Sequence, residues 1–137
     1  MIGYFTRAGD SRVGVAFQPW REGFNQLLKK TTGLKTYGKE LGLILIEYYL
    51  EGEFLPLPAK KYKLLPYSNK ERSISVVVAV SKDFAAMDED SKKRFIVETT
   101  IESVRLVQSK MKRLGFTKID FTQLLDDVEK CAKEYLG

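Results

Sequence analysis

The chain has 137 residues, 44% of them hydrophobic and 12% aromatic, which excludes a disordered chain and supports a buried core. It contains no histidine, so Ser-His-Asp and Cys-His catalytic groups and histidine-based metal sites are excluded. The formal net charge is +5, and all of the surplus lies in residues 1–72. This surplus could attract an acidic partner or nucleic acid, or simply keep the chain in solution. We expect a single α+β domain over residues 1–137.

The expected location is the cytoplasm. The longest apolar run, residues 41–50, is too short for a membrane span and contains Gly42 and Glu47. The first residues show no basic region followed by an apolar segment, so we expect no signal peptide. Cys131 stands alone and cannot form an internal disulfide.

Two short strands and a helix are predicted in the first 33 residues. IGYFT (residues 2–6) and RVGVAF (residues 12–17) flank RAGDS, whose Gly-Asp pair suits a turn. A helix is expected from about Pro19, with Phe24, Leu27 and Leu28 on one face. Gly33 is expected to end this helix in the left-handed conformation.

Three further strands follow. Residues 41–50 and 72–81 are rich in branched and aromatic residues, and residues 60–67 form a shorter edge strand that ends at Pro66. Alternation predicts which side chains face the helices: Ile44, Ile46, Tyr48 and Leu50, and Ile74, Val76, Val78 and Val80. The opposite face then carries Leu43, Leu45, Glu47 and Tyr49, and Ser73, Ser75, Val77, Ala79 and Ser81.

Two helices complete the chain. Residues 91–114 begin with Ser91 or Asp90 as the cap, and Gly115 ends them. Their apolar face is formed by Val97, Ile101, Val104, Val107, Met111 and Leu114. In the last helix, Asp120 and Gln123 resemble a capping box. Its buried stripe is formed by Phe121, Leu124, Leu125, Val128, Cys131, Ala132 and Tyr135.

Strands joined by short turns pair antiparallel. The predicted fold is therefore α+β, an antiparallel β-sheet with helices packed mainly on one face and two C-terminal helices.

Residues 33–39 match G-x-x-x-x-G-K, the front of a phosphate-binding loop. The motif requires Ser or Thr next, to hold Mg²⁺, but Glu40 stands there and would repel a phosphate. The loop should also follow a strand and open a helix, whereas here a helix is followed by a strand. We predict a connection punctuated by glycine rather than a nucleotide site.

Glu47 is the only charge within the apolar run of residues 43–50. It could act as a general base or face a partner, or it could lie on the solvent side of a two-faced strand. Its alternation with Ile46 and Tyr48 favours the solvent side. Cys131 is interpreted as a small buried hydrophobe. We expect no catalytic residue, no cofactor and no metal site.

The segment PAKKYKLLPYSNKER (residues 58–72) combines cations with tyrosines. Such a pattern suits single-stranded RNA, whose bases stack on aromatic rings. It also suits an edge strand protected from aggregation, or an edge that binds a protein. Its charged and aromatic residues are Lys60, Lys61, Tyr62, Lys63, Tyr67, Lys70 and Arg72.

Three segments, ELGLILIEYYLEGEFLPLP, RSISVVVAVSKDF and FTKIDFTQLLDDVEKCAKEYL, resemble small cytoplasmic immunity proteins of bacterial polymorphic-toxin and contact-dependent growth inhibition systems. The likeness spans roughly residues 36–137 and carries no residue-level motif. Immunity proteins against basic nuclease toxins tend to be acidic, whereas this chain is basic. The resemblance therefore implies a toxin with an acidic surface, or binding away from the active site of the toxin.

The first functional hypothesis is a non-catalytic immunity protein that neutralises a cognate toxin by direct binding. The alternative is a small basic nucleic-acid-binding module, and an enzyme that uses carboxylate, lysine or tyrosine is the third. A membrane partner is not expected. The residues expected to bind the partner lie on the open sheet face and the basic edge: Glu47, Tyr49, Lys61, Tyr62, Lys63, Ser73 and Ser75.

Overall fold

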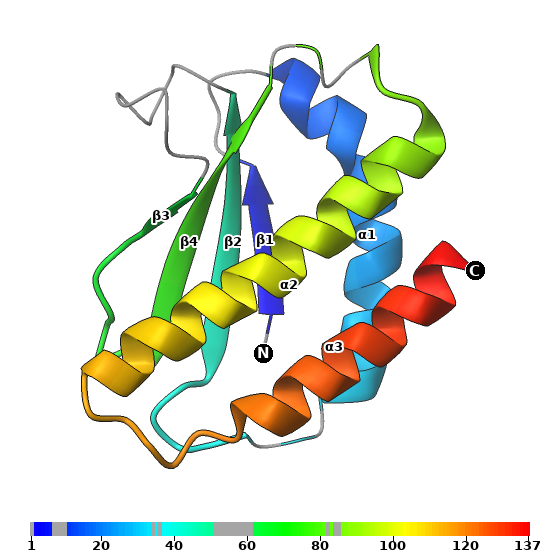
Figure 1. The fold of residues 1–137 in the computed structure, drawn as a ribbon. Coiled ribbons are helices and arrows are strands. Elements are labelled where there is room, and N and C mark those ends of the chain that lie inside the picture. Colours follow the sequence, from blue (N-terminus) through cyan, green and yellow to red (C-terminus); the bar gives the residue numbers. More distant parts are fainter. Residues whose placement is uncertain are drawn as a thin grey trace.

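In the computed structural model, helices cover one face of a four-stranded sheet (Figure 1). The structure describes residues 2–6, 11–33, 35, 37–50, 62–81, 83 and 86–137, and for residues 3–6, 11–21 and 50 it describes the backbone alone. The elements are β1 (Ile2–Thr6), α1 (Ser11–Thr32), β2 (Leu43–Leu50), β3 (Tyr62–Leu64), β4 (Ser73–Val80), α2 (Glu89–Arg113) and α3 (Phe121–Leu136). Helices α1 and α2 pack on the sheet, and α3 packs mainly on α1 and α2.

The strand order is β1-β2-β4-β3 and the sheet is mixed. The α+β class, the helices on one face and the two C-terminal helices are confirmed, but the expected antiparallel sheet is wrong for two of the three pairs. β1 and β2 are parallel, as are β2 and β4, and only β3 and β4 are antiparallel. The reason is the path of the chain. Helix α1 carries it back between β1 and β2, and β3 runs in reverse so that β4 returns in the direction of β2.

The N-terminal region contains one strand instead of two. β1 is confirmed, but residues 12–17 lie within α1, and Pro19 lies in its interior rather than in its first turn. The alternation over six residues was too short to identify a strand. Tertiary packing fixes the helix, because Phe24 and Leu28 are fully buried on its core side. Gly33 is not left-handed, and its N–H donates to the Lys29 carbonyl at 2.9 Å.

The predicted alternation of β2 and β4 is confirmed. Ile44 and Ile46 are 0% exposed and Tyr48 is 1% exposed, all on the face that the helices cover. On β4, alternate residues from Ile74 to Val80 lie in the same core. The sequence specifies which side chains of these strands face the core, because one face of each strand must be buried.

The apolar stripes of the two C-terminal helices are largely as predicted. Three details differ, two at the helix caps and one at the end of α2. The cap of α2 is Asp88, whose carboxylate accepts a hydrogen bond from the Ser91 N–H at 2.7 Å, rather than Ser91 or Asp90. Leu114 lies beyond the end of α2 and is exposed. Gly115 ends α2 with φ +88°, and Asp120 caps α3, both as expected. The Gln123 side chain, however, does not complete a capping box, because it donates to Asp127.

Candidate partner-binding site

The sheet face opposite the helices brings together four of the predicted residues. We call it the open face, and its described members from this set are Glu47, Lys63, Ser73 and Ser75. Glu47 and Lys63 lie on either side of Val77, two strands apart, which places their backbones roughly 10 Å from each other. Lys63 is exposed, and the other three are partly exposed.

Part of the open face is less accessible than expected. Tyr49 was predicted to face a partner, but it is 8% exposed and packs with the fully buried Val77. Leu65 and Ala79 pack against this pair. The accessible part therefore lies toward the start of β2 and β4, where Leu43 is 37% exposed beside Ser73.

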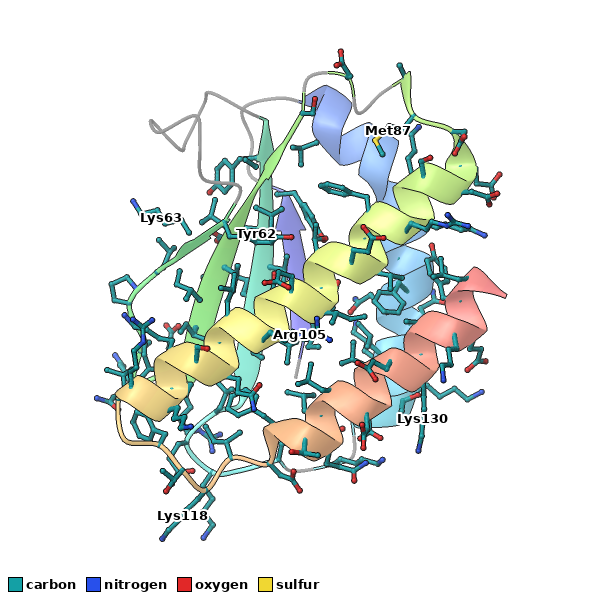
Figure 2. The ribbon with its side chains drawn as sticks, in the orientation of Figure 1. Tyr62, Lys63, Met87, Arg105, Lys118 and Lys130 are labelled. Atoms are coloured by element: carbon teal, nitrogen blue, oxygen red, sulfur yellow. The ribbon has the colours of Figure 1, made fainter. Side chains whose placement is uncertain are left out.

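Two other predicted residues do not join this group. Tyr62 pairs with Val78, so its side chain lies on the helix side of β3, while Lys63 points away from the helices (Figure 2). Burial raises the pKa of Tyr62, with further contributions from Glu102 and Glu98 on α2. Lys61 lies outside the described residues. Neighbouring side chains of β3 thus lie on opposite faces of the sheet, so Tyr62 and Lys63 do not form one surface.

The segment that resembles a phosphate loop connects α1 to β2, and no helix begins after Lys39. Gly38 has φ +153°, and a Cβ at this position would lie 3.0 Å from the Ile119 Cα. Glycine is required here by close packing against the segment that precedes α3. The predicted order of helix, connection and strand is confirmed.

A buried carboxylate, which the sequence analysis did not identify, holds this connection against α3. Asp127 is 1% exposed and accepts hydrogen bonds from the Tyr37 hydroxyl at 2.6 Å, Gln123 Nε2 at 2.9 Å and Lys35 Nζ at 3.1 Å. Its sequence signal was available, because an aspartate three residues after Leu124 falls within the apolar stripe of α3.

The electrostatics of this network keep Asp127 ionised. Burial would raise the pKa of Asp127, but the hydrogen bonds from Tyr37, Lys35 and Gln123 together hold it below its ordinary value. Burial and the adjacent carboxylate raise the pKa of Tyr37. A carboxylate that is covered and bonded in this way is poorly placed to take a proton from a substrate. Its role is to position the connection between α1 and β2.

Other features of the described residues offer no second chemical centre. Within those ranges, no group of three or more Cys, Asp or Glu residues could hold a metal ion. A surface pocket of about 390 Å³ lies beside the start of α2, but it mixes Asp90 and Glu98 with Lys93 and Arg94. Cys131 is buried on α3, as predicted. No helix in the described part of the chain is long and apolar enough to cross a membrane.

Comparison with known proteins gives one match. The model of immunity protein 44 (Imm44) matches residues 5–134, nearly the whole chain. No curated protein and no solved structure matches. The family supports the resemblance noted in the sequence and implies a toxin as the protein partner. The chain therefore belongs to the immunity protein 44 family, a family of immunity proteins of polymorphic toxin systems, and its role is one of immunity.

Proposed function

We propose that this chain is a non-catalytic inhibitor that binds its cognate toxin directly, in the cytoplasm of the cell that makes both. The proposal includes contact-dependent growth inhibition as the system to which the pair belongs. The observation that carries it is the open face: an immunity-family chain presents one side of its sheet without a helix over it among the described residues.

The composition of the open face suits a protein partner. Leu43 and Leu45 supply apolar surface, and the serines of β4 leave room for side chains of the partner. Glu47 and Lys63 carry opposite charges on the same face, which would fix the orientation of a complementary surface. The proposed contact residues are therefore Glu47, Lys63, Ser73 and Ser75, and Tyr49 supports this face by packing against Val77. Lys61 and Tyr62 complete the predicted set, and Tyr62 would contribute by packing on the helix side of β3 rather than by contact with the partner.

The side chains present support a non-catalytic mechanism. The chain has no histidine, and its buried carboxylate Asp127 is covered and bonded to three donors. Inhibition by covering the toxin requires no reacting group. It requires surface complementarity alone.

The experiment that tests the proposal begins with the toxin itself. The tagged chain is used to isolate its partner at two salt concentrations, and the partner is then produced with and without the chain in the same cells. The chain should restore growth, and the purified pair should form a complex that survives high salt. Restored growth without a complex would contradict direct binding, and recovery of nucleic acid alone, lost at high salt, would contradict a toxin partner.

The surface is tested by a matched pair of variants. Ser75→Arg places a long charged side chain in the open face and should weaken the complex by about tenfold or more. Lys130→Glu changes an exposed residue of α3, on the opposite side of the molecule (Figure 2), and should leave affinity unchanged. Equal affinity of both variants, with unchanged Tm values, would remove the open face from the interface.

A further inference from the structure

Cations gather at the end of the molecule where α1 and α2 terminate and α3 begins, the lower end in Figure 1. Three segments far apart in the sequence meet there: residues 29–42, 67–72 and 110–120. The Asp120 N–H donates to the Tyr37 carbonyl at 2.7 Å, and the Gly42 N–H donates to the Arg72 carbonyl at 2.7 Å. The Tyr67 ring lies 5.2 Å from that of Phe116. These contacts join all three segments into one surface.

This end, which we call the basic pole, contains ten cations. Nine are exposed and Lys110 is partly exposed, and Figure 2 shows Lys118 at the tip. The ten are Lys29, Lys30, Lys35, Lys39, Lys70, Arg72, Lys110, Lys112, Arg113 and Lys118.

The basic pole holds the whole positive surplus of the chain. Its carboxylates are Glu40, Glu71, Asp120 and the buried Asp127, so ten cations against four carboxylates leave +6 there. The remaining thirteen cations and fourteen carboxylates leave −1. The cations of residues 29–72 thus lie beside further cations from the end of α2 and the connection after it. A field of one sign over one end of a small protein steers partners of the opposite sign.

Cations at helix C-termini also offset the helix dipole, and this explains Lys29, Lys30 and the last turn of α2. It does not explain Lys39, Lys70, Arg72 and Lys118, which lie in connections. Helix stability alone therefore does not account for the basic pole.

A pocket of about 240 Å³ opens within the basic pole. Lys35, Lys39 and Arg72 line it, with Tyr37 and three glycines. The Lys35 ammonium is occupied by Asp127 on one side, and the Arg72 guanidinium donates to the Lys39 carbonyl at 3.2 Å, which orients the arginine. The pocket is large enough to admit a carboxylate side chain.

We propose that the basic pole is a second contact with the toxin and binds an acidic surface of it, with the pocket receiving a glutamate or aspartate side chain. The inference rests on the proposed function. The pole is continuous with the accessible part of the open face, because Gly42 and Arg72 lead directly into Leu43 and Ser73. One partner can therefore cover both.

The aromatic residues at this end favour a protein over nucleic acid. Single-stranded nucleic acid binds to exposed rings on which bases stack. Here Tyr67 and Phe116 pack against each other, and Tyr37 is 4% exposed. Nine of the ten cations are exposed, whereas Tyr67 and Phe116 are only partly exposed and Tyr37 is buried, so this end offers bases little open ring surface.

The test uses two defined probes, a short polyglutamate peptide and an oligothymidylate of equal charge, titrated by NMR at about 0.15 M salt. Polyglutamate should shift the amide signals of residues 37–42, 70–72 and 116–119. The triple variant Lys39→Glu, Lys112→Glu, Lys118→Glu should lose at least about tenfold in affinity. The control Arg94→Glu, Lys130→Glu, Lys133→Glu changes the net charge equally, at exposed positions outside the pole, and should keep affinity within about twofold.

Three outcomes would overturn the inference: no binding of polyglutamate at the pole, tighter binding of the oligonucleotide there, or an equal loss in the control variant. Growth protection separates it from the proposed function. If the wild-type chain gives no protection, the proposed function fails. If the pole variant, folded by its Tm, protects and binds the isolated toxin as well as the wild type does, the basic pole alone is refuted.

Discussion

Replacing Tyr37 by phenylalanine removes one hydrogen bond from the buried carboxylate of Asp127 and leaves the ring in place. The bond is 2.6 Å long, both residues are at least 95% buried, and the acceptor is charged. A hydrogen bond of this kind contributes about 1.5–3 kcal/mol. Gln123 and Lys35 still donate to the carboxylate in the variant, so we expect the free energy of unfolding to fall by about 2 kcal/mol. For a domain of this size the Tm should fall by about 6 °C.

The loss of stability caused by Tyr37→Phe should become smaller in acid. The pKa of Asp127 is lowered in the folded protein, so the contribution of its ionised form is fully present above the ordinary value of 3.8. It is lost as the pH falls through the lower pKa of the folded state. The difference in the free energy of unfolding between wild type and Tyr37→Phe should therefore be constant from neutral pH down to about pH 5. It should become smaller as the pH falls below the ordinary aspartate pKa.

The assay is urea denaturation followed by circular dichroism at a series of pH values. Tyr62→Phe is the control, because the ring of Tyr62 is partly buried whereas its hydroxyl bonds to no described residue, and it should change stability by no more than about 0.5 kcal/mol. If Tyr37→Phe behaves like this control, or if its effect does not narrow in acid, then Asp127 does not hold the connection as we describe.

Two further substitutions test the packing. Gly38→Ala should destabilise the protein by about 2–3 kcal/mol, because it adds a contact at 3.0 Å with Ile119 to the strain of a positive φ. Gly115→Ala has the strain alone, with nothing within 4 Å, and should cost about 1 kcal/mol in a thermal unfolding assay; equal effects would contradict the close approach. Leu124→Ala, at a fully buried position of α3, should cost about 2–5 kcal/mol in urea denaturation. Leu114→Ala, at a 48% exposed position, should cost about 0.5 kcal/mol or less, and a similar loss at both would place the core elsewhere.

The elements that the sequence predicted well are those that local periodicity determines. In β2 and β4 the side chains alternate because one face is buried, and in α2 and α3 the apolar stripe repeats at helical spacing. The direction of the strands was not determined in this way. It depends on where α1 and β3 carry the chain, and RVGVAF within α1 reads equally well as a strand until its neighbours are placed.

The candidate site was predictable only in part, for a related reason. Strand alternation placed Glu47, Ser73 and Ser75 on one face, but it did not reveal that Tyr49 is buried there. Lys63 was assigned only to the basic edge, and its pairing with Val77 brings it to the same face. The basic pole was invisible in the sequence because its cations come from three distant segments. The burial of Tyr49 and the basic pole both arise from contacts between residues far apart in the sequence. Local periodicity carries no information on such contacts.

The bond between Tyr37 and Asp127 joins residues 90 positions apart, so it closes a loop of about two-thirds of the chain. Closing such a loop costs more entropy than a local contact does, and a chain rich in such contacts folds more slowly. A chain still emerging from the ribosome, or one cut before α3, would lack this clamp and with it the fixed arrangement of Lys35 and Lys39. Any partner that recognises the assembled pole binds the native state alone and stabilises it by mass action. Recognition through the pole therefore requires a completed fold, and a chain cut before α3 is not expected to bind a partner by this surface.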